Sequence, residues 1–269
     1  MIFVFVWKLF AIGHALGAEG YCGNVRFFFW SNPMDDCVVV VSVNCQGLGN
    51  RQKRKDVFHY LRNKKYSIYF LQDTHFEPKM EIFISAEWGY ESYFSSYSSN
   101  SRGVAILFNN NFEFKVKDIH KGNRGNYIIL TVRIKEIDIL LVNLYGPSRD
   151  EPEFYNTLKE KIMELDNPNV IMAGDWNMVL DTFKDYQNYK HVNNPKAREV
   201  VESMITDLNL CDIWRDLNPD CQRYTWRRTA PFQQARLDFF LVTDSIVSLA
   251  EDSDINCGYR TDHSMVLLN

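Results

Sequence analysis

The chain has 269 residues, of which 46% are hydrophobic and 24% are charged, and its formal net charge is -4 at pH 7. This hydrophobic share is ample for a packed core, which excludes disorder as a description of the whole chain. A weakly acidic chain is also not a histone-like protein that holds nucleic acid by bulk positive charge. A nucleic-acid enzyme with carboxylates around divalent cations remains compatible, because bound cations offset much of the negative charge.

The first eighteen residues, MIFVFVWKLFAIGHALGA, combine an apolar stretch with small residues, which is roughly the pattern of a secretory signal. However, Lys8 follows the apolar residues instead of preceding them, and the stretch is short for a membrane span. We therefore expect residues 1–36 to be an N-terminal extension, and a nuclear or cytoplasmic location without membrane contact. Secretion is the minor alternative.

The six cysteines contain no C-x-x-C pair and no regular spacing. This disfavours a zinc site and a dense disulfide framework. Scattered cysteines in a chain of this length are typical of small buried hydrophobes in a reducing compartment.

From residue 37 onward, short apolar segments alternate with segments of helical period. The segments rich in β-branched and aromatic residues predict strands at 38–43, 67–72, 103–108, 127–132, 137–145, 169–174, 236–242 and 264–268. Several lack polar alternation, so we expect both their faces to be covered. Helices are predicted at 50–65, 152–165 and 195–210. No repeat or flexible linker divides residues 37–269, which predicts one domain of the α/β or α+β class.

Polar residues stand at the ends of several predicted strands. They are Asn44, Asp73, Tyr145, Asp175 and the pair Asp262 and His263. If these strands share a sheet, the side chains gather along one rim as a site for a hard cation and a phosphate. Each segment alone is equally well explained as a turn, a helix cap or a structural side chain. In AGDWN, for example, Gly, Asp and Asn are all turn formers.

Taken together and in this order, SVNCQGLG, FLQDTH, NLYGPS, AGDWN, RLDFFL and YRTDHS resemble the endonuclease/exonuclease/phosphatase superfamily, which includes DNase I and exonuclease III. The run YTWRR, ARLDFFLV and GYRTDHSMV resembles the endonuclease domain of non-LTR retrotransposons. The likeness covers about residues 38–269. It implies an α+β fold, a four-layered αββα sandwich.

The resemblance also implies catalytic roles. Asp175 would activate the attacking water, and Asn177 would hold that water or the phosphate. His263 would bind a phosphate oxygen, with Asp238 orienting its ring and raising its pKa. Tyr145 would donate its hydroxyl to the phosphate or the leaving group.

A divalent metal, Mg²⁺ or Mn²⁺, would be held by Asp73 with Asn44 beside it, and Asp262 is a candidate second ligand. The family has glutamate where Asp73 stands. The shorter side chain withdraws the carboxylate by about 1.5 Å. Either the backbone must lie closer to the metal, or a water must bridge the carboxylate and the metal.

RYTWRR at 223–228 supplies the candidate DNA contacts Arg223, Thr225, Trp226 and Arg227. Arginines pair with phosphates, and a tryptophan can stack on a base or sugar. The alternative is a basic surface hairpin with a buried tryptophan. The basic run at 51–55 is expected to be a solvated helix face that steers DNA.

The leading hypothesis is a metal-dependent endonuclease that nicks one DNA strand so that a retrotransposon can prime reverse transcription, acting as a monomer. One alternative is a phosphatase of the same superfamily with a phosphoinositide or sphingolipid substrate. Another is a catalytically dead relic that only binds DNA.

Overall fold

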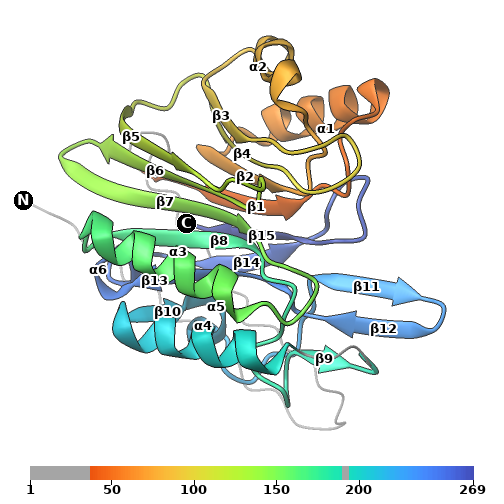
Figure 1. Ribbon diagram of the computed structural model, residues 1–269, viewed down its shortest axis with the longest axis vertical. Helices are drawn as coiled ribbons and strands as arrows, with labels where there is room; N and C mark the ends of the chain where they lie inside the picture. The colour runs from red at the N-terminus through yellow and green to blue at the C-terminus, as the bar shows by residue number, and fades with distance from the viewer. Residues whose placement is uncertain (1–36, 190–193) are drawn as a thin grey trace, which may run out of the picture. The chain divides into compact units, whose positions relative to one another are not determined.

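The computed structural model describes residues 37–189 and 194–269. The described residues form two six-stranded mixed sheets, a small three-stranded sheet and the helices that cover them (Figure 1). The expectations for residues 1–36, an extension or a secretory signal, lie outside the described residues.

The first sheet has the strand order β14-β15-β1-β2-β4-β3. Its strands are β1 (Val40–Asn44), β2 (Ile68–Gln72), β3 (Ser92–Ser95), β4 (Val104–Phe108), β14 (Ser253–Asn256) and β15 (Met265–Leu268). The central strands β1 and β2 run parallel, and every residue in both is buried. Burial on both faces explains why these strands do not alternate strictly between apolar and polar residues.

The second sheet has the order β10-β13-β8-β7-β6-β5. Its strands are β5 (Lys115–Lys121), β6 (Tyr127–Ile134), β7 (Ile137–Tyr145), β8 (Val170–Asp175), β10 (Leu210–Asp212) and β13 (Asp238–Thr243). Here β7 and β8 form the parallel pair, and β13 joins β8 antiparallel.

The longer helices lie in two pairs on the outer faces of the sheets (Figure 1). They are α1 (Arg51–Lys64), α2 (Glu81–Trp88), α3 (Pro152–Leu165) and α4 (Pro195–Asp207). Phe58 of α1 and Trp88 of α2 pack against the first sheet. Leu158 of α3 and Val201 of α4 pack against the second. Short helical turns are η1 (Pro78–Met80), α5 (Ile213–Leu217) and α6 (Asp244–Val247).

The inner faces of the two sheets pack on each other in a third apolar cluster, where Phe70 and Ile106 of the first sheet share a core with Leu130, Ile171 and Phe240 of the second. The layers are therefore helix, sheet, sheet, helix. The predicted α+β fold, a four-layered αββα sandwich, is confirmed. Each sheet is covered by helices on one face and by the other sheet on its second face.

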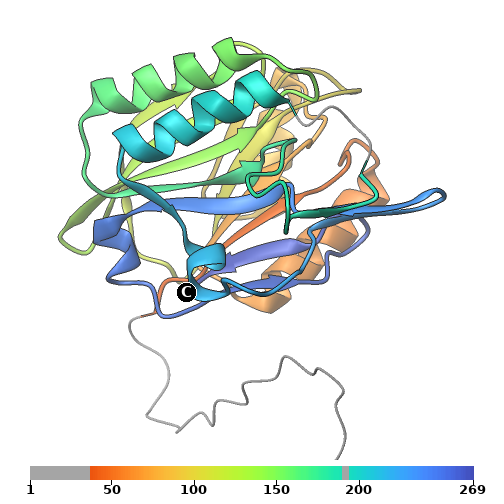
Figure 2. The same ribbon diagram turned by 90° about the horizontal axis from the view of Figure 1, so that it is seen from below.

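A third, smaller sheet lies at one end of the sandwich. It consists of β9 (Tyr186–Gln187), β11 (Trp226–Thr229) and β12 (Phe232–Ala235) in the order β11-β12-β9. The hairpin of β11 and β12 extends away from the stacked sheets in both views (Figures 1 and 2). This geometry places RYTWRR at the base and along the first strand of a projecting hairpin.

The eight predicted strands and three predicted helices are confirmed, with one correction. The third predicted helix ends at Asp207 instead of residue 210, because Leu210 begins β10. The burial predicted for the cysteines holds for Cys45 but is wrong for Cys37 and Cys257, which are exposed. None of the helices in residues 37–189 and 194–269 has the length and apolar character needed to cross a membrane.

Candidate active site

Five strands place polar residues at one edge of the stacked sheets. In the first sheet, Asn44 ends β1 beside Gln72, the last residue of β2. In the second sheet, Tyr145 ends β7 beside Asp175, the last residue of β8, and Asp238 at the start of β13 also pairs with Asp175. The two sheets meet here directly, because Asn44 Nδ2 donates to Asp175 Oδ2 at 2.8 Å.

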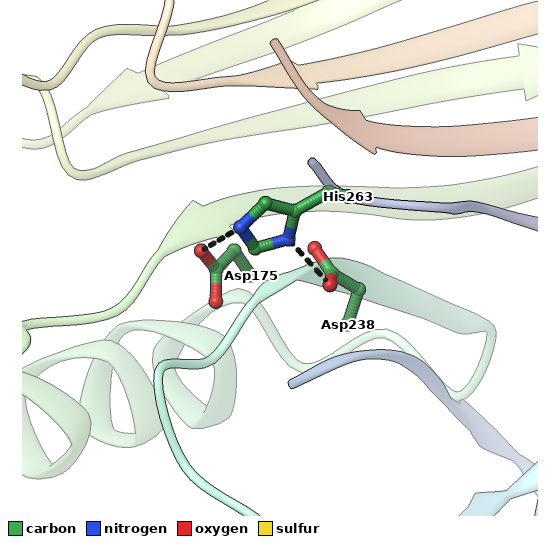
Figure 3. A group of neighbouring side chains, drawn as sticks. All are labelled: Asp175, Asp238 and His263. Atoms are coloured by element: carbon green, nitrogen blue, oxygen red, sulfur yellow. Dashed lines mark hydrogen bonds and ion pairs between the residues drawn. The ribbon is translucent and has the colours of Figure 1, made fainter. Parts of the chain in front are cut away.

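Asp175, Asp238 and His263 form a buried cluster at this edge (Figure 3). His263 Nδ1 lies 2.8 Å from Asp238 Oδ2, and His263 Nε2 lies 3.9 Å from Asp175 Oδ2. The imidazole thus stands between the two carboxylates. A backbone bridge to Trp226 holds His263 in place just before β15 begins.

Burial and neighbouring charges shift the pKa values of Asp175 and His263 in this cluster. Burial raises the pKa of Asp175, the charge of Asp238 raises it further, and His263 with the hydrogen bonds of Asn177 and Asn44 only partly offsets this. Burial lowers the pKa of His263, but the charge and hydrogen bond of Asp238 outweigh it and raise that pKa to about 9. At neutral pH the ring is therefore an imidazolium whose orientation Asp238 fixes.

Two residues predicted to bind ligands make hydrogen bonds to the Asp175 carboxylate and to the backbone of Asp238. Asn44, a predicted metal ligand, donates from Nδ2 to the Asp175 carboxylate, and its Oδ1 accepts from Gln46 N at 2.9 Å. Thr225, a predicted DNA contact, is fully buried. Its Oγ1 accepts from the backbone nitrogens of Leu237 and Asp238 at 2.9 and 3.0 Å. No surface of Thr225 is left for DNA, so it is corrected to a residue that positions Asp238.

The AGDWN segment forms a tight turn that starts at the end of β8. Asp175 Oδ1 accepts from Asn177 N at 2.9 Å, and Asn177 has a left-handed φ of 50°. Between them Trp176 points into the core, where its ring stacks on Phe239 at 4.9 Å. The turn interpretation is thus confirmed for the backbone, and the same turn holds Asp175 and Asn177 at the strand edge.

Tyr145 and Asn177 contact each other beside the cluster. Burial raises the pKa of Tyr145, and the charges of Asp175 and Asp73 raise it further, so the phenol keeps its proton. Asn177 hydrogen-bonds the Tyr145 hydroxyl, and Asn177 Nδ2 donates to Gly146 O at 2.8 Å. A protonated hydroxyl at this position is a donor toward an anionic substrate.

Asp73 and Tyr145 both line a cavity of about 530 Å³. Asp73 follows β2 with a left-handed φ of 49°. Its Oδ1 lies 3.0 Å from His75 Nε2 and accepts from Arg102 N at 3.1 Å. The sequence interpretation assigned no role to His75, although a histidine two residues after an acid in the same motif was the available signal.

The donor atoms at this edge fit a divalent cation that prefers oxygen ligands. Asp238 Oδ1 is buried and has no hydrogen-bond partner among the described residues, so it retains acceptor capacity. Carboxylate oxygens of Asp175 and Asp238 and a ring nitrogen of His263 lie within 4.8 Å of one another, and the carboxylates are the cation ligands because an imidazolium has no lone pair to offer. Asp73 adds a carboxylate that lines the cavity. Carboxylate oxygens are the ligands that Mg²⁺ and Mn²⁺ favour.

The remaining candidates lie on or near the hairpin. Asp262 Oδ2 accepts from Trp226 Nε1 at 3.1 Å, so the predicted metal ligand and the predicted DNA contact touch each other. Arg227 is exposed, and its Nε donates to Gln234 Oε1 at 3.3 Å. Arg223 is also exposed, but its Nη1 is paired with an Asp254 oxygen at 2.5 Å. Arg227 is thus the better placed of the two arginines for a phosphate.

A buried ion-pair network that the sequence interpretation missed supports the start of β13. Arg236 is 1% exposed, and its guanidinium binds Asp185 at 2.7 and 2.9 Å and Asp212 at 2.6 and 3.1 Å. Arg215 also binds Asp185, at 2.5 Å. The network fixes the residue two positions before Asp238. Its members are far apart in the sequence, and no local motif marks them.

Two stacked mixed sheets with helices on their outer faces define an α+β sandwich, and solved structures share this fold. The AP endonuclease LMAP from Leishmania major matches with a TM-score of 0.74 at 16% identity over 86% of each chain. An AP endonuclease from Archaeoglobus fulgidus matches with a TM-score of 0.71 at 18% identity, over 87% of this chain and 99% of that one. A 3' phosphatase from Neisseria, bound to a product DNA hairpin, reaches 0.70 at 17% identity over 87% and 99%.

The Endonuclease/Exonuclease/phosphatase family model matches residues 24–263, and the chain belongs to that family. The chain is also 29% identical over 238 residues to the Transposon TX1 uncharacterized 149 kDa protein of Xenopus laevis. That match covers 85% of this chain but 18% of the length of the transposon protein.

Proposed function

We propose that this protein is a divalent-metal-dependent DNA endonuclease that nicks one strand for target-primed reverse transcription by a retrotransposon. The observation that carries the proposal is the buried cluster in which Asp175 faces the His263 imidazole at 3.9 Å. Phosphodiester hydrolysis needs a base for the attacking water and positive charge for the phosphate. The cluster offers both from this chain's own side chains.

Asp175 is the base in this proposal. Burial raises its pKa above that of an ordinary aspartate, which makes its ionised form a stronger proton acceptor at neutral pH. Asn44 holds Asp175 Oδ2 from the first sheet, so the carboxylate has a fixed direction. Asn177, which shares the turn with Asp175, orients the water or the phosphate.

His263 binds a non-bridging phosphate oxygen as an imidazolium, and Asp238 keeps it protonated and oriented. Tyr145 retains its proton and donates to the phosphate or the leaving oxygen. Mg²⁺ or Mn²⁺, held by Asp73 with Asp262 as a candidate second ligand, would neutralise negative charge on the phosphate and the leaving oxygen.

The β11–β12 hairpin supplies the DNA contacts. Arg227 is exposed on its first strand and pairs with a backbone phosphate. Trp226 is half-buried and is held by Asp262 and by an edge contact with Tyr189 at 5.6 Å, and its exposed part would contact a sugar or base. The likeness to a transposon protein supports the retrotransposon role, and a solved neighbour bound to a DNA hairpin supports DNA as the substrate.

A pair of assays tests the substrate class. The purified protein with Mg²⁺ is incubated with supercoiled plasmid, and conversion to the open circle is measured on a gel. In parallel, phosphate release is measured from a 3'-phosphorylated oligonucleotide and from a phosphoinositide. We expect nicking of the plasmid. Phosphate release without nicking would show that the protein is a phosphatase of the same family and not an endonuclease.

A further inference from the structure

We propose that His75 is a positioning residue for the metal ligand Asp73, and that it fixes the short carboxylate so that one oxygen is left for the cation. This inference rests on the metal dependence in the proposed function. It concerns a histidine outside the Asp175, Asp238 and His263 cluster.

The Asp73 carboxylate is held on one oxygen by two donors. His75 Nε2 and Arg102 N lie 3.0 and 3.1 Å from Oδ1, and neither contact uses Oδ2. The side chains of His75 and Asp73 are 24% and 15% exposed, so water competes little for this hydrogen bond. An imidazole N–H that donates from Nε2 to Oδ1 fixes the rotamer of the carboxylate.

The backbone is shaped to bring these two side chains together. Asp73 and His75 both have left-handed φ angles, 49° and 57°, with the buried Thr74 between them. Aspartate and histidine are among the residues that tolerate this conformation best. The segment is tied to the loop after β1, where Gly47 N donates to Asp73 O at 2.8 Å.

The His75 imidazole packs closely against the backbone of this loop at Gly47. A Cβ added at Gly47 would lie 2.8 Å from His75 Nδ1, which is closer than real Cβ contacts. Gly47 therefore leaves room for the ring, and its own φ of +77° also favours glycine. The ring is thus clamped between the Gly47 backbone and the Asp73 carboxylate. The fixed His75 donor can compensate for the shorter side chain of Asp73, because it restricts the carboxylate to few positions.

Mn²⁺ affinity of the full chain without DNA tests this, measured by calorimetry and by electron paramagnetic resonance of the free ion. We expect His75→Ala to weaken Mn²⁺ binding by about 10- to 100-fold, the usual cost of losing a residue that orients a metal ligand. His75→Gln keeps an amide donor near the position of Nε2 and should restore most of the affinity. His120→Ala is the matched control, because His120 makes a similar pair with Asp118 at 2.9 Å on the edge strand β5.

A double-mutant cycle with Asp73→Ala separates positioning from direct ligation. If His75 acts through Asp73, His75→Ala has no further effect on Mn²⁺ affinity once Asp73→Ala is present. An equal loss with His75→Gln and His75→Ala would mean that the ring itself binds the metal, and would overturn the proposal. Unchanged Mn²⁺ affinity in His75→Ala, or no Mn²⁺ binding by the wild type, would also overturn it.

Nicking kinetics give an independent readout. In His75→Ala the rate at low Mn²⁺ should fall and recover at high Mn²⁺, with the KM for plasmid unchanged. A raised KM with normal Mn²⁺ affinity would make His75 a DNA contact and reject the inference. A wild type that binds Mn²⁺ but never nicks DNA would refute the proposed function alone, because the binding measurement contains no DNA.

Discussion

At the scale of single residues, one imidazole joins the two halves of the site. His263 precedes β15 of the first sheet, whereas Asp175 and Asp238 belong to adjacent strands of the second sheet. The 2.8 Å contact with Asp238 is therefore a contact between the sheets, and Asn44 makes another with Asp175. Because four buried polar groups depend on one another here, the loss of any one leaves a partner without its hydrogen bond.

Gly174 gives a residue-scale prediction for the strand that carries Asp175. A Cβ at Gly174 would lie 1.8 Å from Leu144 O on the neighbouring strand. We expect Gly174→Ala to force β7 and β8 apart and to lower the free energy of unfolding by about 3 kcal/mol. Urea denaturation followed by tryptophan fluorescence measures this. Gly89, at a helix end, has a φ of +88°, but nothing lies within 4 Å of a Cβ added there. Gly89→Ala therefore measures the cost of a left-handed backbone alone, and an equal loss of stability in that variant would refute the packing argument.

The sequence predicts the site residues better than it predicts their contacts. Asp175 and His263 stand at the ends of predicted strands, so a shared sheet edge was enough to expect them together, whereas Asp238 lies inside the predicted strand 236–242 and its role came from the family resemblance. The role of Thr225 could not be predicted, because burial of its hydroxyl depends on how the hairpin base folds back onto β13. The same holds for His75, whose contact with Asp73 depends on two left-handed backbone angles.

At the scale of elements, the strands that the sequence failed to predict are short or polar. They are β3, β5, β9, β10, β11, β12 and β14. In β5, KVKDIHK, no residue is buried, because the strand lies at the edge of the second sheet. An edge strand has backbone partners on one side only, and charged residues on it discourage pairing with other chains. The apolar pattern that identifies central strands is therefore absent.

The hairpin provides the element-scale prediction. We expect Arg227→Ala to weaken binding to duplex DNA and to reduce the slope of log affinity against log salt by about 0.9, the value for one phosphate contact. Arg223→Ala is the matched control, since its guanidinium is already paired with Asp254. Fluorescence anisotropy at several salt concentrations measures both. A larger loss for Arg223→Ala than for Arg227→Ala would contradict the assigned contacts.

At the scale of the whole described domain, buried polar groups tie the layers together. Between the sheets, Gln72 Nε2 donates to Asn143 Oδ1 at 2.7 Å, and Asn143 Nδ2 donates to the carbonyls of Leu71 and Ala105 at 3.0 and 2.8 Å. These bonds cross an otherwise apolar core and fix how one sheet sits on the other. They hold the sheets in register close to the edge where the site lies.

The buried pair of Asp185 and Arg236 makes stability depend on pH. Burial raises the pKa of Asp185, but the hydrogen bonds and charges of Arg236 and Arg215 outweigh it, so the folded-state pKa lies below the ordinary value. The unfolded chain then binds more protons in acid, and the stability that this group contributes is lost as pH falls below about 4.

We expect Asp185→Asn to cost about 3 kcal/mol at pH 7, because it leaves Arg236 buried with one partner fewer. The cost should shrink toward pH 3, because the unfolded wild type takes up a proton there that the folded state excludes from Asp185. Urea denaturation at pH 7, 5 and 3 measures both proteins. A cost that stays constant across this range would show that Asp185 does not carry the acid sensitivity.

The catalytic roles of Asp175 and His263 are tested most directly by Mg²⁺-dependent nicking of supercoiled plasmid by the wild type, by Asp175→Asn and by His263→Ala. Folding of each variant is checked by circular dichroism. We expect that the wild type converts the plasmid to the open circle, that EDTA abolishes this, and that each variant is slower by about 10²- to 10⁴-fold. Equal nicking by the wild type and both folded variants would contradict these roles.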